Sequence, residues 1–134
     1  VDNLLSVSMT KDTDYDNLKL YMKGLFIDAV KEQIYIQGKL LTSQEIKSKT
    51  MTIILISLIL DSPDKRVHSS RIPASSYSKN PSEMSSKIIT PLRQLFQQYF
   101  NLNFPITLDD NGQGFNIQLH TCSIPITILR KRNI

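Results

Sequence analysis

The sequence predicts an α+β protein in which a mostly antiparallel sheet of about five to seven strands packs with one long helix. Two observations predict this class. Short segments that alternate apolar and polar residues, typical of half-buried strands, occur in both halves of the chain. One segment, at about residues 80–99, instead repeats apolar residues at helical spacing. Because 134 residues fit one domain, we expect residues 1–134 to form a single domain with a polar, serine-rich connector at about residues 61–80.

The N-terminal part of the chain predicts two strands. Residues 5–10 alternate leucine, valine and methionine with serine and threonine, which is the period of a half-buried strand. Residues 18–23 alternate in the same way. A helix over residues 15–30 is the alternative, but Gly24 and the alternation favour a strand.

The middle of the chain predicts two more strands. Residues 34–40 alternate apolar and polar side chains, and Gly38 within them indicates a bulge or a close backbone approach. The segment Met51–Leu60 is apolar on both faces, which predicts a central strand covered on two sides. The turn formers and the proline of residues 61–64 end this strand.

Two further strands are expected near the C-terminus. Phe115, Ile117 and Leu119 alternate with polar residues, and residues 124–129 place isoleucine at every second position. Residues 110–112, Asp-Asn-Gly, supply the turn that precedes this last pair of strands.

The long helix has a clear start signal and one irregularity. Asn80 is expected as the N-cap, Pro81 as the first helical residue, and Glu83 as the partner that completes a capping box. Pro91 lacks a backbone N–H, so we expect the helix to be kinked or split there. The predicted apolar face consists of Met84, Ile88, Leu92, Leu95, Phe96 and Tyr99.

Composition limits the class of protein. No apolar run reaches the roughly 18 residues of a membrane span, and no signal peptide is visible, so we expect no membrane association. A single cysteine, Cys122, excludes an internal disulfide and favours a reducing compartment. We therefore expect a soluble protein of the cytoplasm or nucleus. The net charge of +4 could attract nucleic acid or an acidic protein surface.

The sequence does not present an enzyme site. His68 lies in a polar loop, and His120 with Cys122 supplies two candidate metal ligands where zinc usually takes four, or three plus water. Residues 109–114 superficially resemble a calcium loop but lack its ligand spacing, so a hairpin turn is favoured. We expect no catalytic residues, no metal and no cofactor.

Binding of single-stranded nucleic acid is an alternative function. Three strands, an apolar strand, a helix and two closing strands are compatible with an OB-like barrel. Such domains stack bases on exposed aromatic side chains among basic residues. The candidate face consists of Lys19, Tyr21, Lys23, Tyr35 and Lys39.

The order of elements from residue 53 to residue 108 is similar to that of the small subunits of proteasome assembly chaperones. The apolar segment 53–60 is followed by a polar excursion, by Ile72-Pro73, and by the amphipathic helix. Asn101 or Asn103 then leads into a predicted strand at residues 104–108, Phe-Pro-Ile-Thr-Leu. The C-terminal end departs from the family pattern, because it reads as a strand where family members close with a helix.

The resemblance implies a non-enzymatic chaperone. It would form a heterodimer with a related small subunit and dock a proteasome α subunit during assembly of the core-particle α-ring. The isoleucine-rich final strand could pair with a partner's sheet edge. Alternatively, the same isoleucines fill this chain's own core. The candidate partner-binding residues are Ile124, Ile126, Ile128, Arg130, Lys131 and Arg132.

Overall fold

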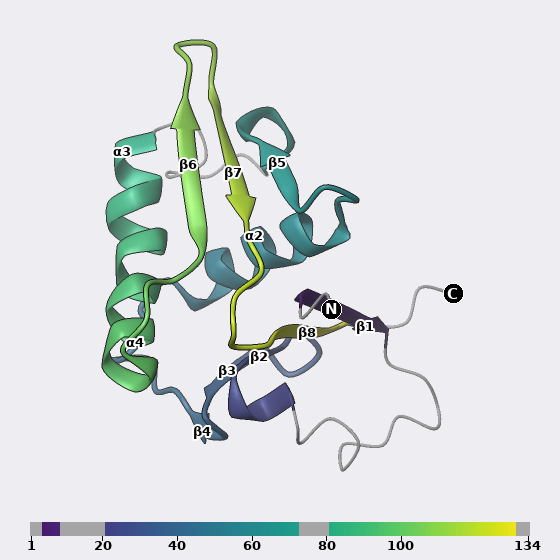
Figure 1. Ribbon diagram of the computed structural model, residues 1–134, viewed down its shortest axis with the longest axis vertical. Coiled ribbons are helices and arrows are strands. Elements are labelled where there is room, and N and C mark those ends of the chain that lie inside the picture. Colours follow the sequence, from purple (N-terminus) through teal and green to yellow (C-terminus); the bar gives the residue numbers. More distant parts are fainter. Residues whose placement is uncertain (1–3, 9–20, 73–80, 131–134) are drawn as a thin grey trace. The chain divides into compact units, whose positions relative to one another are not determined.

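The computed structural model describes residues 4–8, 21–72 and 81–130 of the chain (Figure 1). Contacts divide the chain into two compact units: unit 1 comprises Val1–Ile53 and Thr121–Ile134, and unit 2 comprises Ile54–His120. Helices and strands occur together, so the predicted α+β class is confirmed. The strands form a five-stranded and a three-stranded sheet, however, so the expectation of one mostly antiparallel sheet is wrong.

Unit 1 contains a mixed sheet with the strand order β1-β8-β2-β3-β4. Its strands are β1 (Leu4–Ser8), β2 (Leu25–Asp28), β3 (Gln33–Ile36), β4 (Lys39–Leu40) and β8 (Ile126–Arg130). Strand β8 runs parallel to both of its neighbours, β1 and β2, whereas β2, β3 and β4 pair antiparallel. The C-terminal strand therefore lies inside the sheet and separates β1 from β2.

The core of unit 1 surrounds the central strands β2 and β8. All four residues of β2 and the first four of β8 are buried, as in strands that are covered on both faces. On one face, the rings of Phe26 and Tyr35 meet edge to face with centroids 6.1 Å apart. The hydroxyl of Thr127, buried among the same strands, has no hydrogen-bond partner among the described residues.

The second and third predicted strands differ from the structure. Residues 9–20 lie outside the described part, residues Tyr21–Lys23 form a 3-10 turn (η1), and the strand begins only at Leu25. The third strand is two strands, β3 and β4, joined by Gln37 and Gly38, whose φ angles of 52° and 78° suit a two-residue hairpin. Because no atom lies within 4 Å of a Cβ built at Gly38, this glycine serves the turn and not a close approach.

The segment expected as a central strand is a helix, α2 (Lys49–Asp61). A long apolar run does not by itself distinguish a buried strand from a buried helix. The buried positions recur at helical spacing, because residues 52, 53, 55, 56, 59 and 60 are buried while 54, 57 and 58 are partly exposed. The segment is also long for a strand and contains no glycine or proline. The stop at Asp61 is confirmed, since the residues after it form a turn.

Unit 2 contains an antiparallel sheet with the strand order β5-β7-β6. Its strands are β5 (Arg66–His68), β6 (Ile106–Asp110) and β7 (Phe115–Leu119). Strand β5 and the 3-10 turn η2 (Ser69–Arg71) lie in the segment expected as a connector, and residues 73–80 of that segment are outside the description. The predicted strand at 115–119 and the turn before it are confirmed.

The predicted long helix is confirmed, and its irregular turn lies just before Pro91, not at Pro91 itself. It consists of α3 (Pro81–Met84), a π-helical turn η3 (Ser85–Ile89) and α4 (Thr90–Phe100). In the π turn, the N–H of Thr90 donates to the Ser85 carbonyl, five residues back. Asn101, with a φ of 56°, ends the helix in the left-handed conformation. The expected N-cap Asn80 lies outside the described residues.

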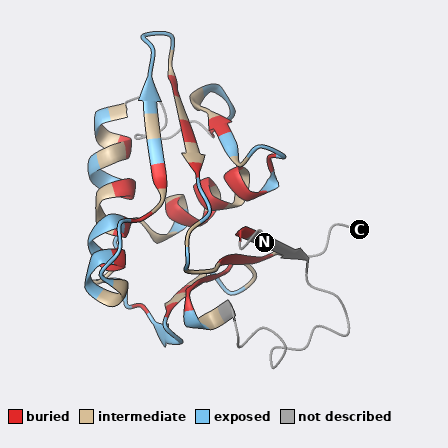
Figure 2. Cartoon of the chain, viewed as in Figure 1, coloured by how far each residue is buried: buried red, intermediate tan, exposed pale blue. Residues whose placement is uncertain are grey.

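One side of this helix forms the core of unit 2. The predicted apolar positions are buried except Tyr99, which is partly exposed. Figure 2 shows this buried side turned toward strand β6. The ring of Phe96 lies 4.8 Å from that of Phe100 and 5.0 Å from that of Phe104, measured between centroids. An aromatic cluster therefore joins the helix to the segment that leads into β6.

Candidate protein interaction site

The two central isoleucines among the predicted partner-binding residues belong to the core of unit 1. Ile126 and Ile128 each have 0 % of their surface exposed. Strand β8, which carries them, pairs along one edge with β1 and along the other with β2. While the sheet is formed, β8 has no free edge for a partner strand. Within the folded unit, these isoleucines fill the chain's own core.

The other predicted partner-binding residues flank β8. Ile124 precedes the strand and is partly buried, and its N–H approaches the Cys122 sulfur at 3.4 Å. Arg130 is the last residue of β8 and is also partly buried. Lys131 and Arg132 lie outside the described residues. The structure thus leaves Ile124 and Arg130 as the described members of this set with accessible surface.

The predicted nucleic-acid face does not present free stacking groups among its described side chains. Tyr35 packs edge to face on the buried Phe26 ring, and its hydroxyl donates to the Gln33 side chain at 2.8 Å. The Lys39 ammonium forms an ion pair with the Glu45 carboxylate at 3.2 Å. Tyr35 is therefore a packing residue of the sheet.

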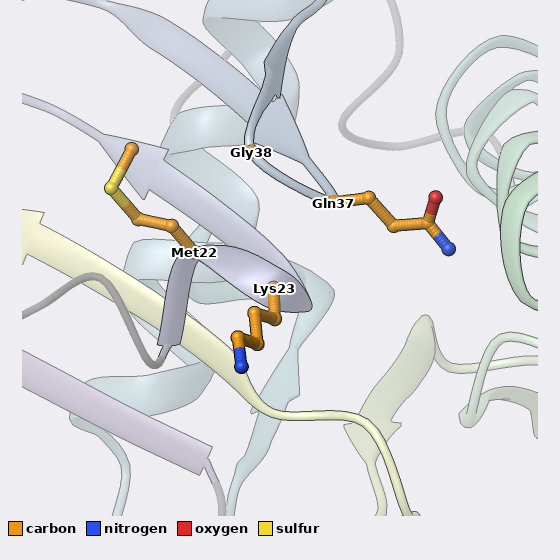
Figure 3. Close-up of a pocket in the computed structure, with 4 residues that line it drawn as sticks. All are labelled: Met22, Lys23, Gln37 and Gly38. Carbon is orange, nitrogen blue, oxygen red and sulfur yellow. The ribbon is translucent and has the colours of Figure 1, made fainter.

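A shallow pocket of about 280 Å³ lies beside Lys23, another residue of the predicted face. Figure 3 shows the side chains of Met22, Lys23 and Gln37 pointing in different directions around the chain at Gly38. A binding pocket for a small polar molecule usually has convergent polar groups, and these side chains do not converge. Lys19 and the side chain of Tyr21 lie outside the described residues.

The two histidines make local structural contacts. The Nδ1 atom of His68 accepts the backbone N–H of Ser70 at 3.1 Å, which caps the 3-10 turn η2. The Nε2 atom of His120 lies 3.1 Å from the Thr107 hydroxyl. Across residues 4–8, 21–72 and 81–130, no three or more His, Cys, Asp or Glu side chains gather closely enough to hold a metal ion.

The acidic turn at residues 109–114 is a hairpin between β6 and β7. The Asp110 carboxylate accepts the N–H of Gly112, and the Asn111 side-chain oxygen accepts the N–H of Gln113, both at 3.0 Å. These oxygens hold the turn itself, as Asx side chains commonly do. The hairpin that the sequence predicted is present, and it brings Asp109 and Asp110 to the end of strand β6.

The feature that sequence reasoning missed is the open edge of strand β6. The residues that flank β6 form backbone hydrogen bonds with the β7 side of the hairpin. The Pro105 carbonyl accepts the N–H of His120, and the Asn111 N–H donates to the Gly114 carbonyl. Bonding direction alternates along an antiparallel strand, so the N–H and C=O groups of residues 106, 108 and 110 point away from β7. Among the described strands β6 is the last in its sheet, so these groups face an edge that no described strand covers.

The start of this edge is already occupied within the chain. The Ile106 carbonyl accepts a hydrogen bond from the Arg93 guanidinium on helix α4 at 3.1 Å. The Ile106 N–H donates to the Phe104 carbonyl at 2.8 Å. In the described part of the chain, the outward groups of Leu108 and Asp110 have no such partner. We call these backbone groups of Leu108 and Asp110 the open β6 edge.

The opposite edge of this sheet, formed by β5, is less suited to pairing. Strand β5 has three residues and runs directly into the η2 turn, whereas β6 has five residues. Its end is tied to β7, because the Phe115 N–H donates to the Ser69 hydroxyl at 3.2 Å. Short edges that end in a turn accept another strand poorly. The open β6 edge is thus the better pairing site in unit 2.

Sequence alone carries a weak signal for this edge. Proline and aspartate are residue types that occur at sheet edges, where a missing N–H or a charge is tolerated. This segment contains Pro105, Asp109 and Asp110. Strand order decides whether such a strand has a free side, and order is not encoded in the alternation of residues 106–110. The edge could therefore be suspected from the sequence but not located.

Comparisons of this chain with protein-family models, with curated proteins and with solved structures found no match. Over the described residues, no helix combines the length and the apolar character required to cross a membrane.

Proposed function

We propose that this chain is a non-enzymatic protein-interaction module, a subunit of a heterodimeric chaperone that assists assembly of a multisubunit complex. The open β6 edge is the observation that carries this proposal. The resemblance of residues 53–108 to proteasome assembly chaperones supplies the finer version, in which the partner is a related small subunit and the client is the proteasome α-ring. Work on such a complex would take place in the cytoplasm or nucleus.

The edge is suited to pairing with an extended segment of another protein. Leu108 and Asp110 together offer two N–H donors and two C=O acceptors in one line, which is the arrangement used in β-strand addition. Each hydrogen bond contributes a net of about 0.5–1.5 kcal/mol. Four of them would contribute about 2–6 kcal/mol, which the cost of association largely offsets. The partner must therefore also contact side chains around the edge.

A second copy of this chain fits the edge poorly. Antiparallel pairing that uses both open residues would place Leu108 opposite Asp110 of the copy and Asp109 opposite Asp109. Residues in such a position have Cα atoms about 4.5 Å apart, so the two carboxylates would repel each other. A pairing that places Leu108 opposite Leu108 of the copy would need the backbone N–H and C=O of Ile106. These groups already bond to the Phe104 carbonyl and the Arg93 guanidinium. A different chain is favoured as the partner.

The proposal is tested by isolating the tagged chain from its native cells and identifying bound proteins by mass spectrometry. We expect a similar-sized chain at equal stoichiometry, with proteasome α subunits present in smaller amounts. If the chain is recovered alone, or bound only to single-stranded nucleic acid in a salt-sensitive way, the proposal fails.

Two variants at one position connect the partner to the edge. Leu108→Pro removes the outward N–H, whereas Leu108→Ala removes most of the side chain and keeps the N–H. Neither change removes a bond of β6 to β7, because residue 108 bonds away from β7. We expect Leu108→Pro to lose the partner, whereas Leu108→Ala, which keeps the edge hydrogen bonds and loses only apolar contact, should weaken binding much less. Equal retention by both variants would place the partner elsewhere on the protein.

A further inference from the structure

We infer that the segment bound at the open β6 edge is an extended stretch with two adjacent basic residues next to an apolar one. This inference rests on the proposed function and specifies the chemistry of the partner. It follows from the sides of the sheet on which the side chains of β6 lie. It also follows from the exposed carboxylates of β6, which form no ion pair with another described residue.

The register of β6 against β7 fixes the two sides. Leu108 lies opposite Ile117, which is completely buried, so Leu108 belongs to the side that faces the core of unit 2. Asp109 lies opposite the partly exposed Asn116 and belongs to the outward side. A strand added at the edge continues the same alternation. Its residue beside Leu108 would therefore meet apolar surface, and its residue beside Asp109 would face outward.

The acidic end of the edge selects the charge of the partner. Asp109 and Asp110 are both exposed, and no ion pair joins either carboxylate to another described residue. Basic residues beside these two positions would neutralise them, whereas acidic residues would add like charges at cross-strand distance. The partner strand thus requires a basic residue beside Asp110, a second basic residue beside Asp109 and an apolar residue beside Leu108.

Arg93 limits the pairing at the other end. Its guanidinium covers the Ile106 carbonyl, so a partner strand meets a cation and an occupied backbone group there. A basic residue beside Ile106 would be repelled by this guanidinium. The charge of the edge therefore changes from positive at residue 106 to negative at residues 109 and 110. This gradient favours one register of a partner that carries its basic pair at one end.

The test uses the full chain, labelled with nitrogen-15, and two synthetic peptides that differ only in charge. The first is acetyl-Thr-Val-Thr-Val-Lys-Lys-Val-Thr-amide, and the second has glutamate in place of both lysines. We expect the lysine peptide to shift the backbone amide signals of Leu108 and Asp110 and to bind about tenfold more tightly than the glutamate peptide. The preference should vanish in Asp109→Asn/Asp110→Asn and reverse in Asp109→Lys/Asp110→Lys.

The possible outcomes separate this inference from the proposed function. Equal binding of both peptides at Leu108 and Asp110 would refute the basic partner and leave strand pairing at this edge intact. Failure of both peptides to shift these amides would overturn the inference, while the proposed function would still be judged by recovery of a partner from cells. Reversible dimerisation of the chain in sedimentation experiments, lost in Leu108→Pro, would show that a second copy occupies the edge and would also overturn the inference.

Discussion

Replacing Gly24 with alanine should destabilise unit 1 by steric conflict. Gly24 is buried beside the segment that leads into β8. A Cβ added to it would overlap the Pro125 carbonyl oxygen and lie 2.9 Å from two carbons of the Pro125 ring. The nearest obstacle is a backbone atom, which cannot rotate away as a flexible side chain can. The backbone at Gly24 and Pro125 must therefore separate.

The separation has a cost that follows from two terms. Forcing an extra carbon into a packed site costs about 1–3 kcal/mol. The same carbonyl of Pro125 accepts the N–H of Leu25 at 3.0 Å, at the point where β2 and β8 begin to pair. Losing this hydrogen bond would cost about 0.5–1.5 kcal/mol. We expect the free energy of unfolding to fall by about 1.5–4.5 kcal/mol.

Urea denaturation gives the change in free energy, and hydrogen exchange of the Leu25 amide reports the local loss of protection. Gly38→Asn is the matched control, because a Cβ at Gly38 meets no atom within 4 Å and asparagine tolerates its positive φ. We expect this control to cost about 1 kcal/mol or less, because its strain comes from the positive φ alone and not from a steric clash. If Gly24→Ala is equally mild and Leu25 remains protected, the close approach of the two segments is wrong.

Three further changes test other parts of the structure. Phe96→Ala should lower the free energy of unfolding by about 3–5 kcal/mol, because the ring is buried among Phe100 and Phe104; a loss below about 0.5 kcal/mol in urea denaturation would contradict this core. Thr127→Val should leave stability unchanged or raise it by about 1 kcal/mol, since it removes a buried hydroxyl without a described partner; clear destabilisation would reveal a missing bond. Glu45 accepts the N–H of Thr42 and pairs with Lys39, and these contacts lower the pKa of Glu45 from 4.5. The ionised Glu45 side chain therefore stabilises the folded state above pH 4.5, and this stabilisation is lost as the pH falls through the lowered pKa of the folded state. Glu45→Gln should remove this part of the pH dependence of the free energy of unfolding. If the variant unfolds with acid as the original chain does, the contacts of Glu45 do not form in solution.

The long helix was predictable because its signals are local. Apolar spacing, Pro81 and Pro91 all lie within one segment, and in the structure the helix includes Pro81 as its first described residue and has a π-helical turn just before Pro91. The hairpin between β6 and β7 was predictable for the same reason, since Asp-Asn-Gly has specific turn preferences. In both cases the information needed was contained in fewer than about twenty-five neighbouring residues.

The errors arose where tertiary contacts decide the outcome. Helix α2 is apolar nearly all round, so alternation could not separate it from a buried strand. The two-residue turn at Gln37 and Gly38 was not predicted, because within residues 34–40 the isoleucines before it and the leucine after it are all at even-numbered positions and so continue a single alternating pattern. The open β6 edge depends on strand order, which joins residues far apart in sequence and is not expressed in local propensity.

The position of β8 inside the sheet also determines when unit 1 can be completed during protein synthesis. Strands β1 and β2 do not pair with each other, and each pairs with β8, whose last residue is Arg130. The ribosome makes the whole of unit 2, residues 54–120, before it makes β8. The edges of β1 and β2 that β8 will later cover are therefore unpaired while unit 2 is being made. Unit 2 is continuous in sequence, so all of its residues are made before β8 emerges, and until then these edges of β1 and β2 are exposed to pairing with other strands.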